Sequence, residues 1–269
     1  MKKQIGLSLS GGGVKGAAHI GVLKALEEEN IGINYISGTS SGSIVAALYA
    51  IGYKPNEILE IFKINAKNVK YYDLKNLLKL IFGTLIKREI IIEGLTDGKA
   101  IEKLMREKCI QKNIMNIKDT PIPLLIPAVK LHNGEVTFFS TKLTRSSFSD
   151  EIEYIDYIDI PSAVRASCSY PGVFVPKSIN GNKYIDGGVR ENIPWKGLKE
   201  IGADTIVSVI FEKTIKEKCK INIIDIIESS INIMGHELAN YELIGENKIL
   251  KIFICYLHSY FWQVLIFVV

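Results

Sequence analysis

Closely spaced cysteines and histidines are scarce in this sequence of 269 residues. Its four cysteines lie far apart and form no Cys-x-x-Cys pair, and only four histidines are present. A zinc site or a disulfide framework usually shows as cysteines or histidines at short, regular spacings. We therefore expect neither, and we assign the chain no metal and no cofactor.

A strong excess of charge is also missing. The 33 basic and 29 acidic residues leave a net charge of +4, which is too small to indicate a nucleic-acid partner. Only a few apolar residues separate Met1 from Gly11, which is too short a run for a secretory signal. These features predict a cytoplasmic, reduced setting and no nucleic acid.

Internal repeats and low-complexity linkers are not found either. Apolar residues make up 47% of the chain and charged residues 23%, which is typical of a folded globular protein. A chain of this length can bury one large core, so a single domain is expected. We divide it into a main part over residues 1–211, a helical part of the same domain over 212–251, and an apolar tail over 252–269.

Charge is unevenly placed along the chain. The tail, Ile252–Val269, has 18 residues and no Asp, Glu, Lys or Arg, which is at the lower length limit for a membrane span. It is a buried final strand or helix, a tail that contacts a membrane, or a terminus foreign to the ancestral fold. Between Glu60 and Ile90, seven basic residues outnumber three acidic ones. A basic amphipathic segment can lie on an anionic membrane surface, although a solvated helix face is more common.

The first part of the chain alternates strands and helices. Apolar strands are expected at Gln4–Leu9 and Tyr35–Ser37, and helices over 17–29 and from Ile44 onward. This order predicts a parallel sheet covered by helices. A helical excursion is expected over about 53–118, with one helix at 74–81 and another at 97–108 that is capped by Thr96. A hairpin of strands at 122–130 and 135–140 follows, and then a helix opened by Pro161. The last expected elements are a strand at 184–185, a helix at 195–201, a strand at 205–211 and a helix at 221–239.

A Gly-x-Ser-x-Gly turn separates the second strand from its helix. In Gly38-Thr39-Ser40-Ser41-Gly42, the glycines permit a tight bend that holds Ser40 with its hydroxyl exposed. Such a serine is a candidate nucleophile, but it needs a base to take its proton. The simpler alternative is a turn serine that caps the helix.

A glycine-rich loop follows the first strand. The run Gly11-Gly12-Gly13-Val14-Lys15-Gly16 formally matches a dinucleotide fingerprint, but the second strand lacks the acidic residue that would bind a ribose. A P-loop is excluded because Lys15 is followed by Gly16. The remaining interpretation is an oxyanion hole, since successive glycine N–H groups at a helix N-terminus point donors at one spot.

Two residues compete for the role of base. His236 comes after Ser40 and Asp186, so a Ser…Asp…His triad is formally available, but His236 lies inside a predicted helix. Asp186 ends a predicted strand and is followed by Gly187 and Gly188. A carboxylate within reach of a serine can act as the base directly. Its alternative is an ordinary Asp-Gly turn.

Taken together and in this order, the glycine loop, the Ser40 turn and Asp186-Gly187-Gly188 resemble the patatin-like phospholipase family. The segments Ala166–Phe174 and Asn192–Pro194 also resemble that family, and the resemblance covers about residues 4 to 211. It implies a three-layer α/β/α sandwich with a mainly parallel sheet.

The resemblance also implies a reaction. Ser40 attacks an acyl ester of a phospholipid or related lipid, Asp186 takes the proton, and the N–H groups of Gly11, Gly12 and Gly13 bind the oxyanion. The supporting motif glycines are Gly16, Gly38, Gly42, Gly187 and Gly188. A lipid substrate at a membrane surface is the expected partner. A non-catalytic lipid-binding module on the same fold is the second class of function.

Overall fold

The fold is taken from a computed structural model of the chain. It describes residues 3–65, 93–145, 150–211, 223–242, 249–254 and 265–266. The predicted helix at 74–81 and most of the basic segment lie outside the described residues.

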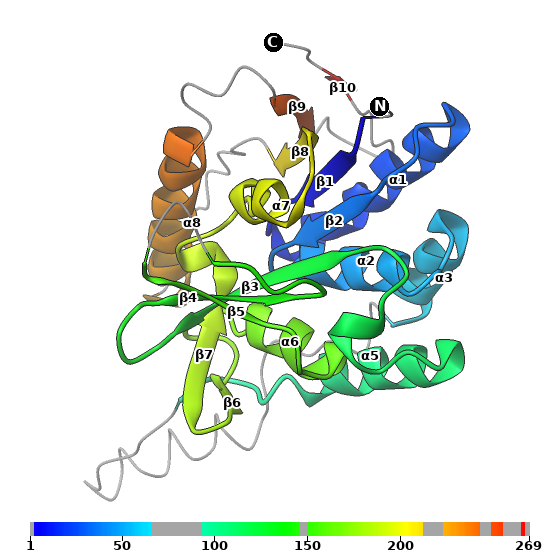
Figure 1. The fold of residues 1–269 in the computed structure, drawn as a ribbon. Coiled ribbons are helices and arrows are strands. Elements are labelled where there is room, and N and C mark those ends of the chain that lie inside the picture. Colours follow the sequence, from blue (N-terminus) through cyan, green and yellow to red (C-terminus); the bar gives the residue numbers. More distant parts are fainter. Residues whose placement is uncertain are drawn as a thin grey trace, which may run out of the picture.

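A mixed, mainly parallel sheet runs through the molecule (Figure 1). Its strand order is β10-β9-β8-β1-β2-β3-β4-β5, with β7 added to β3 and β6 to β7. The strands are β1 (Ile5–Leu9), β2 (Tyr35–Gly38), β3 (Leu124–Lys130), β4 (Val136–Ser140), β5 (Ile152–Ile155), β6 (Lys177–Ile179), β7 (Asn182–Asp186), β8 (Thr205–Phe211), β9 (Ile249–Ile254) and β10 (Leu265–Ile266). The neighbours β9, β8, β1, β2 and β3 are parallel, as the alternation of strands and helices predicts.

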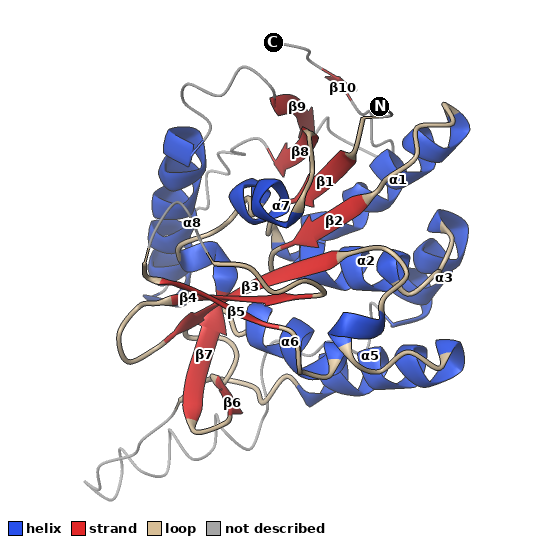
Figure 2. Cartoon of the chain, in the orientation of Figure 1, coloured by secondary structure: helices blue, strands red, loops and turns tan. Residues whose placement is uncertain are grey.

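Helices cover both faces of this sheet, so the fold is a three-layer α/β/α sandwich (Figure 2). The α-helices are α1 (His19–Glu28), α2 (Ser41–Ala50), α3 (Pro55–Asn65), α5 (Lys99–Lys112), α6 (Ile160–Ser167), α7 (Trp195–Ile201) and α8 (Ile223–Glu242), and the 3₁₀ helices are η1 (Gly13–Ala18), η2 (Ile117–Asp119) and η3 (Gly187–Val189). Alternate residues of β3 divide between two cores: Ile126 packs with α1, α2 and α6 on one face, and Leu125 packs with α7 on the other. The predicted fold class is confirmed.

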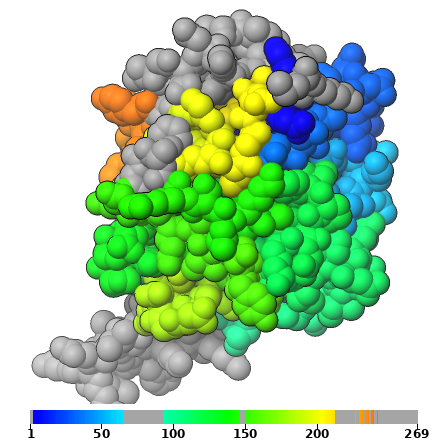
Figure 3. All heavy atoms as spheres, in the orientation of Figure 1, coloured from blue at the N-terminus to red at the C-terminus, as the bar shows by residue number. Residues whose placement is uncertain are grey.

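Sequentially distant segments form the α7 side of the molecule. In the space-filling view, the N-terminal segment lies beside the yellow segment that contains α7 and β8 (Figure 3). The pairing of β1 with β8 accounts for this, because Ile5 is in register with Thr205 and Leu9 with Val209. A Cβ on Gly6 would lie 2.9 Å from that of Ala203, so β1 carries a glycine where the α7–β8 connection approaches it closely.

Most predicted elements appear at the expected places, and two details are wrong. Thr96 does not cap α5: the N-cap is Gly98, and Thr96 instead exchanges backbone hydrogen bonds with Val173 and Val175. The helix expected from Ala17 begins earlier as the 3₁₀ helix η1 and becomes α-helical only at His19. The glycine loop therefore leads into a 3₁₀ turn, not directly into α1.

Strands β2 and β7 share one edge of β3. Strand β2 pairs in parallel with the first residues of β3, at Leu124 and Leu125. Strand β7 pairs antiparallel with the last ones, where Asp186 is in register with Ala128. Because the two strands approach along the same edge from opposite directions, their C-terminal ends meet.

The first residues of the apolar tail extend the sheet. Strand β9 pairs in parallel with β8, and Ile252 is in register with Val209. The described part of the tail is thus strand. No helix among the described residues is long and apolar enough to cross a membrane.

Candidate active site

Ser40 occupies a strained turn between β2 and α2. Its φ and ψ angles are 51° and −123°, as N-cap of α2. The other described non-glycine residues with positive φ are all asparagines, which tolerate this region far better than serine. Its backbone N–H donates to the Ser167 Oγ at 3.0 Å. Strain held in place by neighbouring contacts is typical of a nucleophile elbow.

The glycines of this turn are required by close packing. A Cβ on Gly42 would lie 2.6 Å from the Leu9 carbonyl oxygen and 2.7 Å from that of Ser10. A Cβ on Gly38 would overlap the backbone of Gly42. Helix α2 therefore begins in direct contact with the end of β1, which brings the Ser40 turn beside the glycine-rich loop.

Asp186 lies at the end of β7 and is buried, with 2% of its surface exposed. Its Oδ1 accepts a hydrogen bond from the Gly188 N–H at 2.8 Å, and Oδ2 has no hydrogen-bond partner among the described residues. Burial raises the pKa of Asp186 to about 6, against the opposing effects of the Ser40 hydroxyl and the Gly188 N–H. A carboxylate with this pKa is ionised at neutral pH and still basic enough to accept a proton.

The serine hydroxyl and this carboxyl group are neighbours. The Ser40 hydroxyl lies close enough to Asp186 to lower its pKa. Oδ2 has no hydrogen-bond partner among the described residues, so it is available to accept a proton. Hydrogen bonds between a nucleophile and its base are often long without substrate and tighten when it binds. The structure thus brings together the two residues that the sequence assigns as nucleophile and base.

The glycine-rich loop lies against Ser40. A Cβ on Gly11 would be 3.4 Å from the Ser40 Cβ. The Gly11 N–H, however, already donates to the Asn192 Oδ1 at 3.0 Å. The N–H groups of Gly12 and Gly13 donate no hydrogen bond to the described residues. Of the three predicted donors, two therefore remain available.

His19 contacts the residue that precedes the glycine-rich loop. Its Nε2 lies 2.8 Å from the Ser10 carbonyl oxygen, and its ring lies 4.7 Å from that of Phe211. Complete burial lowers the pKa of His19 to about 4, so the ring is neutral and Nε2 donates to the carbonyl. His19 is thus a structural residue, as expected for a histidine on a helix.

The remaining histidines differ in their relation to the site. His132 lies exposed in the turn between β3 and β4. His236 lies in α8, as predicted, but its side chain is outside the described residues. Its neighbour Gly235 approaches the Gly188 carbonyl oxygen, since a Cβ there would be 3.5 Å away. No group of three His, Cys, Asp or Glu residues in the described part of the chain is arranged to hold a metal.

Three polar residues at the site are not predicted, because neither their spacing nor the composition around them indicates a functional role. Ser167 and Asn192 bind the backbone of the Ser40 turn and of the glycine loop, respectively. Cys168 is buried beside Ser40 and Asp186, and burial raises its thiol pKa to about 12. All three lie in segments that only the family resemblance singles out. Side-chain bonds between segments distant in sequence are fixed by the fold, and periodicity does not reveal them.

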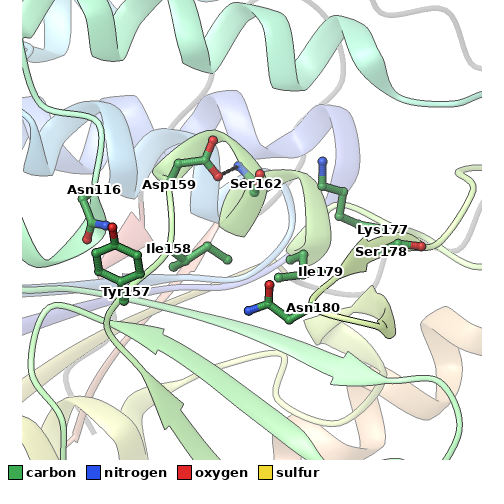
Figure 4. Close-up of a pocket in the computed structure, with 9 residues that line it drawn as sticks. All are labelled: Asn116, Tyr157, Ile158, Asp159, Ser162, Lys177, Ser178, Ile179 and Asn180. Carbon is green, nitrogen blue, oxygen red and sulfur yellow. Dashed lines mark hydrogen bonds between the residues drawn. The ribbon is translucent and has the colours of Figure 1, made fainter.

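A separate groove lies away from these residues (Figure 4). Two charged residues line it, Asp159 and Lys177. Asp159 caps α6 by accepting a hydrogen bond from the Ser162 N–H, and it also forms an ion pair with Arg106 at 2.6 Å. Lys177 forms an ion pair with Glu102 at 2.7 Å. The charged groups that line it are therefore already neutralised by partners. This groove offers no alternative reactive centre.

Comparison with known proteins agrees with the motifs. The profile of the patatin-like phospholipase family matches residues 7–199. The chain belongs to the patatin-like phospholipase family. It is 32% identical over 199 residues to the uncharacterized protein YqhO of Bacillus subtilis, covering 71% of this chain and 66% of that one.

Other relatives are longer proteins. The chain is 27% identical over 211 residues to an uncharacterized NTE family protein of Mycobacterium tuberculosis, covering 77% of this chain and 48% of that one. It is 31% identical over 209 residues to a lysophospholipase NTE1 of Cryptococcus neoformans, covering 77% of this chain and 11% of that one. The chain thus spans about half the length or less of these relatives.

A solved structure supports the fold alone. The crystal structure of VipD from Legionella pneumophila superposes with a TM-score of 0.50 at 15% identity, covering 97% of this chain and 62% of that one.

Proposed function

We propose that this member of the patatin-like family is a serine hydrolase of lipid acyl esters that works through a Ser40–Asp186 dyad. The observation that carries the proposal is the buried Asp186 carboxyl, with a pKa of about 6, beside a serine on a strained strand-to-helix turn. A lipid ester is the favoured substrate because the chain belongs to a phospholipase family and resembles a protein named lysophospholipase.

The proposed reaction has two stages, acylation and deacylation of Ser40. Ser40 Oγ attacks the ester carbonyl carbon while its proton passes to Asp186. The oxyanion is bound by backbone N–H groups of the glycine loop, and the leaving alcohol takes the proton back from Asp186 as the acyl-enzyme forms. A water molecule then attacks the acyl-enzyme while Asp186 accepts its proton. As the fatty acid is released, the Ser40 oxygen takes this proton back from Asp186, which restores the serine hydroxyl and the carboxylate.

Nucleophile and base variants test this dyad. Ser40→Ala and Asp186→Asn are each expected to lower kcat for a lysophospholipid or a p-nitrophenyl ester by about 10³-fold or more, because each removes one half of the proton transfer. A fluorophosphonate probe is expected to label the parent protein and the exposed-serine control Ser178→Ala, but not Ser40→Ala. An unlabelled parent would instead support the non-catalytic lipid-binding module.

One observation favours testing His236 as a second candidate base. Helix α8, which carries His236, approaches the Asp186 turn at Gly188. In a Ser-Asp-His triad, His236→Ala would cripple hydrolysis as severely as Ser40→Ala. If the dyad acts alone, the same substitution leaves kcat within about threefold of the parent, since His236 then takes no part in the proton transfer.

We further propose that the substrate is met at a membrane surface. The support is the basic excess between Glu60 and Ile90 together with the apolar Ile252–Val269 segment. The proposed location is accordingly the cytoplasm, with peripheral contact to lipid.

A further inference from the structure

We propose that Asn192 is a positioning residue that fixes the glycine-rich loop against the Ser40 turn, so that the oxyanion is bound by Gly12 and Gly13 and not by Gly11. This inference rests on the proposed hydrolase function and refines its oxyanion hole.

The hydrogen bond from Gly11 to Asn192 is unambiguous in direction. The Gly11 N–H can only donate, so the atom that it meets at 3.0 Å is the Asn192 Oδ1. This bond consumes the Gly11 donor and leaves the loop anchored at its first glycine. The next two N–H groups, of Gly12 and Gly13, donate to none of the described residues. They are therefore the donors of this loop that remain available to an oxyanion.

Asn192 is itself held in place from two sides. The preceding residue, Glu191, donates its backbone N–H to the Gly187 carbonyl at 2.7 Å, which ties the segment to the Asp186 turn. The Glu191 carbonyl accepts from the Thr39 Oγ1 at 2.8 Å, which ties it to the residue before Ser40. Asn192 thus transmits the position of both reactive residues to the glycine loop.

The steric environment agrees with this role. A Cβ on Gly11 would lie 2.9 Å from the Asn192 Oδ1, and a Cβ on Gly188 would lie 3.4 Å from the same atom. The Asn192 carboxamide therefore lies between the glycine loop and the turn that follows the base. Glycine at both positions allows this approach.

Removing the Asn192 carboxamide should displace the loop without removing a reacting group. A misplacement of about 1 Å costs about 10²-fold in rate, and loss of an aligned oxyanion donor costs about 10²–10³-fold. We expect Asn192→Ala to lower kcat for p-nitrophenyl butyrate about 10²-fold with KM little changed, because the oxyanion forms only in the transition state.

A matched control separates positioning from general stability. Asn116 also accepts a hydrogen bond from a backbone N–H, that of Lys118 at 3.1 Å. It does so as the N-cap of η2, which is not one of the segments that carry Ser40, Asp186 or the glycine loop. Asn116→Ala should leave kcat within about threefold of the parent, because the half-buried Asn116 bonds neither the Ser40 turn nor the glycine loop. Both variants are assayed well below their melting temperatures, with rates normalised to folded protein.

A double-mutant cycle with Gly11→Ala tests the contact itself. The added methyl group clashes with Asn192 Oδ1, so Gly11→Ala alone should also lower kcat. With Asn192→Ala present the clash is gone, and the combined loss should be at least threefold smaller than the product of the two single losses. A parent-like kcat for Asn192→Ala, or losses that simply multiply, would overturn the inference. A parent without esterase activity would overturn the proposed function as well.

Discussion

Burial of Asp186 affects both the chemistry of the site and the stability of the fold. Its pKa rises from 3.8 to about 6, so between about pH 4 and 6 the native carboxyl holds a proton that the unfolded chain has largely released. Hydrolysis by the dyad requires the ionised form. We therefore expect kcat/KM to increase with pH and to level off above an apparent pKa of about 6, which a pH–rate profile with a soluble ester measures.

The same shift has a stability cost. Between pH 4 and 6 the native state binds more protons than the unfolded state, so this group makes unfolding progressively easier as the pH rises. The full difference of about 2 pKa units corresponds to about 3 kcal/mol above pH 7. We expect Asp186→Asn, which keeps an acceptor for Gly188, to be inactive but more stable than the parent at pH 8. Denaturant unfolding should show that this advantage shrinks toward pH 4, and an advantage independent of pH would contradict the explanation.

At the level of elements, the contact between α2 and β1 determines where Ser40 lies. Helix α2 begins against the carbonyl oxygens at the end of β1, and only a glycine at position 42 permits this approach. The strand, turn and helix signals around Ser40 predict this arrangement well, because they are local. The pairing of β7 with β3, and the Asn192 and Ser167 contacts, depend on segments distant in sequence, so local patterns predict neither.

A pair of glycine substitutions tests the close approach. Gly42→Ala places a methyl group 2.6 Å from a backbone oxygen that cannot move aside, and we expect a loss of about 2 kcal/mol in unfolding free energy together with reduced esterase activity. Gly32→Ala is the matched control, since no atom lies within 4 Å of its added Cβ. It should change stability by less than about 0.5 kcal/mol. Equal effects of the two substitutions in urea unfolding would refute the packing argument.

For the molecule as a whole, the uneven placement of basic charge bears on the proposed contact with lipid. The net charge of the chain is +4, and the segment from Glu60 to Ile90 has a local excess of the same size. Opposite charge draws such a segment to anionic lipid within about 10 Å of the surface at ordinary salt.

Vesicle binding tests this prediction. We expect the parent to co-sediment with vesicles that contain phosphatidylserine, and to do so less at high salt. Neutralising Lys75 and Lys79 to Gln and deleting Ile252–Val269 should together lower the bound fraction at least threefold, since each basic residue near the surface contributes about 1 kcal/mol. Neutralising Lys24 and Lys103 is the charge-matched control, because these lysines lie in α1 and α5. Binding that survives the first set of changes would reject peripheral contact through these segments.

The shared edge of β3 has a consequence for the newly made chain. Ser40 and its glycine loop emerge early in synthesis, but the base arrives only when β7 is added beside β2 on the same strand. A ribosome-bound fragment that stops before residue 186 lacks the Asp186 carboxyl. If the proposed dyad carries out hydrolysis, such a fragment is inactive, and hydrolytic activity reports that the sheet has been completed.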